Sequence, residues 1–207
     1  MIDARWRQRF ARLATEVVVR RPTLWRLFRA PLTWMFDAIA ADWDATRVTP
    51  QHLVPLEAAL DTIREPPARV LDLGTGTGAA ARAIARRWPE AEVVGVDLST
   101  AMIDEARARA DSDRQRYEVA DAAALPFEDG AFDLVTLLNM IPFFDELARV
   151  VRPGGRVAIA FSRGPQTPIY VPSARLRDEL ARRGFGDLTE LSAGAGQSLL
   201  AVRRDQP

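Results

Sequence analysis

The feature that most constrains this chain is a regular alternation, from residue 68 onward, of short apolar runs with amphipathic stretches of helical period. The runs expected to form strands are 68–73, 91–98, 116–121, 131–138, 155–162, 185–192 and 197–204. The stretches expected to form helices are 79–88, 100–110, 145–151 and 172–184. Such alternation predicts crossover units and therefore a parallel sheet, and near-continuous apolar strands fit a sheet covered on both faces.

The last two predicted strands are separated only by residues 193–196, Ala-Gly-Ala-Gly. A connection this short favours an antiparallel hairpin, which we expect at the edge of the sheet. The predicted fold class is therefore α/β, a Rossmann-like doubly wound seven-stranded sheet, mostly parallel with a C-terminal antiparallel hairpin, plus N-terminal helices. At 207 residues the chain is of the size of one domain.

Residue types that the chain lacks exclude several chemistries. The sequence has no cysteine, so thiolate nucleophiles and thiolate metal sites are excluded, and the single histidine, His52, cannot form a multi-histidine zinc site. All 28 basic residues are arginine, which removes the lysine required by P-loop NTPases, kinases and Schiff-base enzymes. We therefore expect no metal.

The N-terminus is basic. Residues 1–30 contain eight arginines against two acidic residues, a net charge of +6, so the remainder carries −6 in a chain of net charge zero. Helical spacing of the apolar residues predicts an amphipathic helix, in which the apolar face is formed by Trp6, Phe10, Leu13 and Val17. We expect further helices at 24–30 and 32–44, with a break near Pro31.

Two interpretations of this basic segment remain open. The helices pack on the domain and leave the arginines in water, or the arginines and interleaved aromatic residues contact an anionic membrane, an acidic substrate or nucleic acid. No apolar stretch is long enough to span a membrane, the longest candidate being 134–144, and no secretory signal is evident. We expect a cytoplasmic protein.

A glycine-rich loop, Val-Leu-Asp-Leu-Gly-Thr-Gly-Thr-Gly at residues 70–78, joins the first strand to a helix. Glycines let the backbone approach a ligand closely, and the following helix presents unpaired amides, so the loop is of the nucleotide-binding type. Alone it is ambiguous, because it also satisfies the degenerate dinucleotide pattern. Asp97 ends the second strand, where its carboxylate can accept both hydroxyls of a ribose.

Residues 66–162 resemble the class I S-adenosylmethionine-dependent methyltransferases, especially the small-molecule branch that includes quinone-biosynthesis enzymes. The family's motifs occur in order and at family spacing. They are 70–78, 94–99 (Val-Gly-Val-Asp-Leu-Ser), 121–135, 148–160 and, more weakly, 36–44, which resembles the helix that closes over the cofactor. The resemblance implies a single methyltransferase domain over 1–207, with residues 1–65 as a helical cover and 66–207 as the cofactor-binding α/β core.

The resemblance also implies contacts to S-adenosylmethionine. Asp72 and the glycines Gly74, Gly76 and Gly78 would line its methionine part. Asn139, just past the fourth strand, would contact its amino group. The alternative for Asp72 is a purely local role in the loop.

The remaining implied contacts lie on the adenosine side. Asp97 would hold the ribose, and Leu98 and Met102 would pack on the adenine. Asp121 and the backbone at Ala122 would read the edge of the adenine. Asp121 as the cap of a turn, and Leu98 and Met102 as ordinary core residues, are the alternatives.

The implied reaction is methyl transfer to a small molecule by in-line displacement, which depends mainly on alignment and requires no dedicated base. The catalytic residues are therefore not identified, although His52, Tyr170 or Asn139 would be candidates for a base. Residues 139–144 differ from the Asn-Pro-Pro-Tyr pattern of nucleic-acid amine methylation, so we expect no nucleic-acid substrate. A nicotinamide-dependent oxidoreductase and a non-catalytic cofactor-binding or lipid-associated module are the alternatives.

Overall fold

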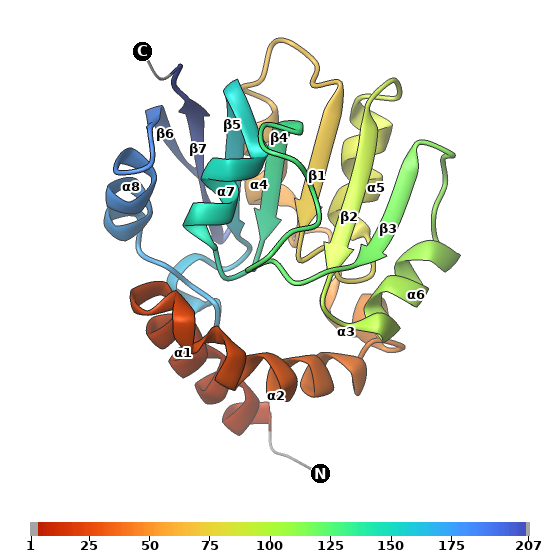
Figure 1. Cartoon of the computed structure of the whole chain (residues 1–207). Coiled ribbons are helices and arrows are strands. Elements are labelled where there is room, and N and C mark those ends of the chain that lie inside the picture. The colour runs from red at the N-terminus through yellow and green to blue at the C-terminus, as the bar shows by residue number, and fades with distance from the viewer. Residues whose placement is uncertain (1–3, 206–207) are drawn as a thin grey trace.

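The computed structural model describes residues 4–205, which fold around one seven-stranded sheet (Figure 1). The strand order is β3-β2-β1-β4-β5-β7-β6. The strands are β1 (Arg69–Leu73), β2 (Glu92–Asp97), β3 (Gln115–Val119), β4 (Phe132–Leu138), β5 (Val151–Phe161), β6 (Phe185–Ala193) and β7 (Gly196–Arg203). The strands from β1 to β5 pair in parallel, whereas β7 is antiparallel to both β5 and β6. The predicted fold class is confirmed.

The helices form layers on both faces of this sheet. They are α1 (Ala4–Arg20), α2 (Trp25–Asp37), α3 (Trp43–Arg47), α4 (Val54–Leu60), α5 (Ala79–Arg87), α6 (Thr100–Ala108), α7 (Phe144–Val150) and α8 (Ser173–Ala181), with short 3-10 helices η1 (Pro22–Leu24) and η2 (Gly164–Gln166). One core, with side chains from α4, α5 and α6, includes Leu60 and Ile84. The other, with α7 and α8, also receives Val18 and Leu32 from α1 and α2.

The strand order reverses between β1 and β4, because the chain first moves outward to β3 and then returns to β4. In open α/β sheets ligands bind at such a switch point, outside the carboxyl ends of the strands. Figure 1 shows α1, α2 and α3 lying across this edge of the sheet. The N-terminal helices therefore lie where a ligand-binding cleft is expected.

Strand β5 begins at Val151, earlier than the predicted residue 155, because its pairing with β4 contains an irregularity. The register jumps between Phe132 and Leu134. Gly154 has φ +73, and a Cβ at Gly155 would lie 2.8 Å from the carbonyl oxygen of Arg152. The two glycines thus permit a bulge, which a simple periodic pattern does not reveal.

The predicted helix break near Pro31 is wrong, and so is the predicted helix over 32–44. Helix α2 continues through Pro31 and ends at Asp37, and residues 38–42 form a turn before the short helix α3. A proline within a helix leaves one carbonyl without its N–H partner, here that of Leu27. Both Pro31 and Leu27 are exposed, so water can bond to this carbonyl.

The predicted apolar face of α1 is wrong in part, because Phe10 packs against the core whereas Trp6 and Leu13 do not. The residues that α1 buries most are small or β-branched, namely Ala11, Ala14, Thr15, Val18 and Val19. Trp6 and Leu13 are instead 51% and 53% exposed. Their spacing fits one helical face as well as that of the buried residues does, and the tertiary contacts decide between the two faces. Within residues 4–205 no helix is long and apolar enough to cross a membrane.

Replacing Pro31 by alanine tests the continuous α2 helix. Pro31→Ala restores an N–H donor within the helix, which is worth up to about 3 kcal/mol, and loses roughly 1 kcal/mol from the greater freedom of the unfolded chain. We expect the free energy of unfolding in urea to rise by about 1–2 kcal/mol. Pro89→Ala, in an exposed turn after α5, is the control and should be slightly destabilising. A loss of stability in Pro31→Ala would contradict the helical assignment.

Candidate functional site

The glycine loop between β1 and α5 has the conformation that its sequence requires. Gly74, Gly76 and Gly78 have φ values of +73, +54 and +83, which side chains rarely permit. A Cβ at Gly74 would collide with Met140 and one at Gly78 with Tyr117, whereas one at Gly76 would meet nothing nearer than Trp43 Nε1 at 4.0 Å. The loop is therefore tightly packed at its ends and leaves space over Gly76.

Asp72 lies in the interior at the end of β1. Its two carboxylate oxygens accept hydrogen bonds from Thr75 Oγ1 at 2.6 Å and Thr136 Oγ1 at 2.8 Å, and it is 1% exposed. Burial raises the pKa of Asp72, and the hydrogen bonds from the two threonines oppose that shift. Asp72 thus connects the glycine loop to β4. This favours a local role in the loop over a contact with the methionine part of the cofactor.

Asp97 connects the loops that follow β1 and β2. Its oxygens accept hydrogen bonds from the backbone N–H of Gly76 at 3.0 Å and of Ser99 at 2.9 Å. Burial raises the pKa of Asp97, opposed by these backbone hydrogen bonds, and the nearby Asp37 adds to the increase. Each oxygen retains a lone pair for a further donor.

Leu98 and Met102 follow Asp97 but differ in exposure. Met102 is 1% exposed, and its backbone N–H donates to Ser99 Oγ, the N-cap of α6. Leu98 is partly buried and lines a cavity of about 360 Å³. Residues of α2 form the other side of this cavity, namely Arg29, Ala30, Thr33, Trp34 and Asp37. Of the two apolar residues, Leu98 is therefore the one at a cavity.

Asp121, just past β3, is bonded to helix α2. Its Oδ1 accepts hydrogen bonds from Trp25 Nε1 at 2.8 Å and from the backbone N–H of Ala123 at 3.0 Å, and its Oδ2 lies 3.4 Å from Arg29 Nη1. Ala122 beside it is 5% exposed. Sequence reasoning missed both Trp25 and Arg29, which lie more than 90 residues away in the chain.

Asn139 follows β4 with a left-handed backbone, φ +55. Its side-chain amide donates to Ser162 Oγ at 2.9 Å and accepts from the backbone N–H of Ser162 at 2.9 Å. The side chain therefore joins the ends of β4 and β5. The amide is thus committed to the protein rather than turned toward an open site.

The two other candidate bases lie in different surroundings. His52 is partly buried between α3 and α4, and burial lowers its pKa, opposed by the nearby Asp44. The hydroxyl of Tyr170 donates to Gln197 Oε1 at 3.2 Å, and its ring packs edge-on against Phe161. In the described residues no group of three or more His, Asp or Glu side chains is placed to hold a metal ion.

Two further contacts join the N-terminal helices to the same loops. Ser99 Oγ donates to Asp37 at the end of α2, and Thr77 Oγ1 donates to Asp44 of α3. Together with the Trp25 contact, these bonds reach the loops after β1, β2 and β3. Short hydroxyl and carboxylate pairs of this kind have no local sequence signal, which explains why they were not predicted.

The residues at this edge fit an adenosyl cofactor. The space over Gly76 is one that a side chain there would occupy, and Asp97 and Asp121 supply carboxylate acceptors suited to hydroxyl and amino donors. Residues 70–155, which span β1 to the start of β5, match the family model of a methyltransferase domain.

The chain carries an S-adenosylmethionine-dependent methyltransferase domain.

Curated methyltransferases resemble this chain in sequence. It is 40% identical over 141 residues to the malonyl-[acyl-carrier protein] O-methyltransferase of Halorhodospira halophila, covering 64% of this chain and 48% of that protein. It is 44% identical over 106 residues to the demethylmenaquinone methyltransferase of Thermus thermophilus, covering 47% and 48%. The chain thus spans about half the length of these two relatives.

Solved structures agree on the fold. A chain from the complex between the Haloferax volcanii Trm112 methyltransferase activator and a methyltransferase superposes with a TM-score of 0.71, at 22% identity. The match covers 82% of this chain and 98% of that one. At this level of identity the likeness concerns the architecture of the methyltransferase domain.

The buried carboxylate of Asp72 predicts a specific pH dependence of stability. Because its folded pKa is raised, the ionised form costs stability above that pKa, and the cost is relieved as the pH falls toward the ordinary carboxyl range near 4. Asp72→Asn removes this dependence. We expect the stability of the wild type, relative to the variant, to increase from pH 8 to pH 5.5 in urea unfolding.

Asp104→Asn, at an exposed position of α6, is the control. Its free energy of unfolding should differ from that of the wild type by the same amount from pH 8 to pH 5.5. A constant difference for Asp72→Asn as well would show that Asp72 takes up no proton between pH 8 and pH 5.5 in the folded protein, and would contradict the prediction.

Proposed function

We propose that this protein binds S-adenosylmethionine at the carboxyl edge of β1 to β4 and transfers its methyl group to a small-molecule acceptor. The observation that carries the proposal is the convergence of the glycine loop, Asp97 and Asp121 at the point where the strand order reverses. The family match over residues 70–155 and the named relatives support it.

The proposed roles of the residues follow from their positions. Asp97 accepts the ribose hydroxyls while it also holds the N–H groups of Gly76 and Ser99. Asp121 accepts a hydrogen bond from the amino group of the adenine, and the adenine ring packs on Leu98. The loop at Gly74 and Gly76 lines the methionine part, with Gly78, Asp72 and Asn139 supporting the ends of β1 and β4, and with Met102 and Ala122 packed behind the adenine.

When bound, the cofactor supplies a methyl group on a positively charged sulfur, which any aligned oxygen, nitrogen or carbon nucleophile can attack in line. The protein contributes alignment, and well-oriented reactants can lower a barrier by roughly 7–11 kcal/mol. The acceptor must therefore be held against the methyl group, and water must be excluded. The chain's N-terminal helices are the elements placed to do both.

We infer that the chain forms one domain in which α1, α2 and α3 act as a cover. The sequence predicted a cover over residues 1–65, but α4 within that range packs with α5 and α6 in the core. The rings of Phe36 and Trp43 pack edge-on with centroids 5.8 Å apart, and Trp43 faces Gly76 across the glycine loop. Asp37 and Asp44 are bonded to Ser99 and Thr77, in the loops that would hold the cofactor. These contacts support a cover that opens and closes with the cofactor.

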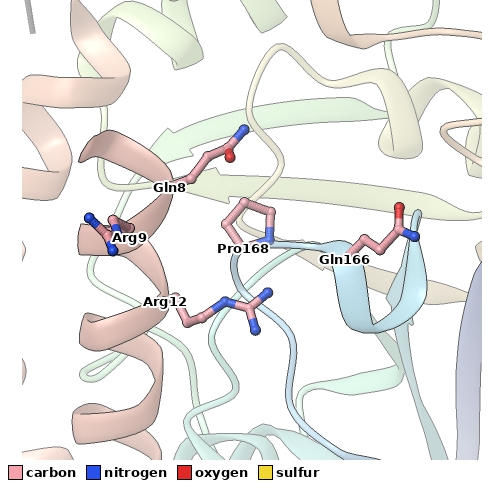
Figure 2. Close-up of a pocket in the computed structure, with 5 residues that line it drawn as sticks. All are labelled: Gln8, Arg9, Arg12, Gln166 and Pro168. Atoms are coloured by element: carbon pink, nitrogen blue, oxygen red, sulfur yellow. The ribbon is translucent and has the colours of Figure 1, made fainter. Parts of the chain in front are cut away.

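A cavity beside α1 supports the role of this helix in acceptor recognition. It has a volume of about 440 Å³ and is lined by Gln8, Arg9, Arg12, Gln166 and Pro168. Figure 2 shows Gln8 and Arg12 reaching from α1 toward Pro168, and Arg12 also donates to the carbonyl oxygens of residues 165 and 167. Two guanidinium groups and two amides favour an acceptor with an anionic group.

We further propose that the basic N-terminus contacts an anionic membrane surface. The large apolar side chains that are exposed in residues 4–205 are Trp6, Leu13, Leu27, Trp34 and Val119, and all but Val119 lie on α1 or α2. Arginines flank them along both helices. Aromatic and aliphatic side chains among arginines are typical of interfacial helices, which supports a membrane-dissolved acceptor.

Calorimetric titration with S-adenosylmethionine, S-adenosylhomocysteine and NADH tests the main proposal. Binding of the first two and not of NADH is the expected result. A preference for NADH would establish the oxidoreductase alternative. Methyl-transfer assays with quinones, phenols, amines and lipid head groups would then identify the acceptor, and no transfer to any class would favour the non-catalytic module.

Asp97→Asn should weaken the binding of S-adenosylhomocysteine by about 10- to 100-fold. The substitution keeps the size of the side chain but removes the charge from hydrogen bonds that are worth about 1.5–3 kcal/mol when an ionised group takes part. It also places an amide nitrogen where one of the two oxygens accepts from Gly76 or Ser99, so one backbone hydrogen bond is lost as well. Calorimetry measures the affinity, and urea unfolding measures the stability that is lost with that bond. The exposed Asp104→Asn is the matched control, and an unchanged affinity in Asp97→Asn would exclude the ribose role.

Trp6→Ser combined with Leu13→Ser should lower binding to vesicles containing phosphatidylserine by more than tenfold. Both side chains are about half exposed, and burial of such a side chain in an apolar phase contributes about 1.5–3 kcal/mol. Vesicle flotation measures the effect, and wild-type binding should also decline with salt. Val119→Ser, at an exposed apolar residue of β3, should bind like the wild type. Equal flotation of the double variant would show that Trp6 and Leu13 do not enter the membrane, and a wild type that does not float would leave the arginines in solvent.

A further inference from the structure

Helix α2 touches Asp121 through a side chain that is itself held firmly. Trp25 is 8% exposed, and its ring packs edge-on against Phe143 with a centroid distance of 5.2 Å. Its Nε1 donates to Asp121 Oδ1 at 2.8 Å. An indole N–H is only a donor, so this contact fixes one oxygen of the carboxylate as an acceptor directed at the helix.

The two oxygens of Asp121 are consequently different. Oδ1 accepts two short hydrogen bonds, from Trp25 and from the backbone N–H of Ala123 at 3.0 Å. In the described part of the chain, Oδ2 has only the longer contact of 3.4 Å with Arg29, whose side chain is 54% exposed. An exposed ion pair at this distance contributes little and is easily exchanged. Oδ2 is therefore the oxygen available to a ligand.

The contact of Oδ2 lies beside a cavity. Arg29 lines the cavity of about 360 Å³ in which Leu98 forms part of the opposite wall. We place the flat ring on Leu98 with its edge toward Arg29, the lining residue that contacts Asp121. An exocyclic amino group on that edge can donate to Oδ2 once Arg29 has moved away, whereas a carbonyl oxygen would face the carboxylate with a like partial charge.

We propose that Trp25 is a positioning residue that selects a 6-aminopurine. It locks Oδ1 of Asp121, so that Oδ2 must act as the acceptor for the amino group, and Arg29 is a displaceable occupant of that acceptor. This inference rests on the proposed binding of S-adenosylmethionine and adds to it the group that enforces the choice of base. A site built around a hydrogen bond rejects an analogue that lacks the donor, because a buried polar group is then left unpaired.

The test compares two ligands that differ only at this edge, S-adenosylhomocysteine and S-inosylhomocysteine, in calorimetric titrations of the full chain. The wild type should prefer the adenosyl ligand by about 100-fold. Trp25→Phe keeps the ring against Phe143 and removes the N–H. The substitution should lower the affinity for the adenosyl ligand about tenfold and change the affinity for the inosyl ligand less than twofold. The preference for the adenosyl ligand should therefore decrease. Trp6→Phe on α1 is the matched control and should change neither.

Asp121→Asn provides an independent variant. With Oδ1 still held by Trp25 and Ala123, the amide nitrogen must occupy the position of Oδ2 and donate toward the ligand, so the preference should reverse in favour of the inosyl ligand. In the double variant with Trp25→Phe only the backbone N–H of Ala123 still holds Oδ1, so the amide is held less firmly and the reversal should become smaller.

Arg29→Gln should raise the affinity for the adenosyl ligand by about two- to fivefold at low salt, because the ligand no longer has to displace the guanidinium from Oδ2. This gain in affinity should vanish at high salt. Arg26→Gln, an exposed position on the same helix, controls for the loss of charge.

Equal weakening of both ligands in Trp25→Phe would overturn the proposal, because it would assign Trp25 to packing alone. An Asp121→Asn protein that still prefers the adenosyl ligand would also overturn it. A wild type that binds neither ligand would instead refute the proposed function on which this inference depends.

Discussion

The carboxylate of Asp97 bonds together two loops at the carboxyl ends of β1 and β2, where the N–H groups of Gly74 and Thr75 also donate to the carbonyl oxygen of Val96. By accepting the N–H groups of Gly76 and Ser99, it joins the glycine loop after β1 to the start of α6 after β2. Ser99 in turn caps α6 and donates to Asp37, so the same group of bonds extends to the end of α2. The cost of burying a charged carboxylate, seen in the raised pKa of Asp97, is offset by these donors. Loss of this one group would loosen the glycine loop, the cap and the cover together.

The periodic pattern of the sequence was sufficient for the sheet and failed where tertiary contacts decide. Strands β1, β2 and β4 lie where apolar runs predicted them, because strands covered on both faces must be apolar throughout. Strand β3 and the C-terminal hairpin also lie at the predicted positions, although the edge strands β3 and β6 are partly exposed. The face of α1 could not be predicted, because Trp6 and Leu13 have the same helical spacing as the buried Ala11, Ala14 and Val18. In this helix the most deeply buried residues are small or β-branched, since they allow close packing. Of the large residues, Phe10 packs against the core, whereas Trp6 and Leu13 remain exposed.

In the candidate site, too, the sequence predicted some features and missed those that depend on tertiary contacts. Its residues come from loops at strand ends, and their order along the chain is visible in the motifs, so Asp97 and the glycines lie at the predicted edge. Their hydrogen-bond partners were not predictable, because they come from the distant α2 and α3 and depend on how those helices cross the sheet. Asp97 also accepts hydrogen bonds from the protein, at Gly76 and Ser99, which its position at the end of a predicted strand did not indicate. A carboxylate that serves both purposes uses one lone pair of each oxygen for the protein and keeps the other.

The charges around the glycine loop also argue against a dinucleotide, the main alternative ligand for a loop of this kind. Dinucleotide sites place a diphosphate at the N-terminus of the helix that follows the first strand. Here Asp44 from α3 is bonded to Thr77 at the start of α5, and Arg82 and Arg109 are already paired with it. A diphosphate at this position would have to displace one carboxylate and lie near Asp97. A cofactor with a positively charged sulfur and an amino group meets no such repulsion, so the electrostatics favour it over NADH on the same fold.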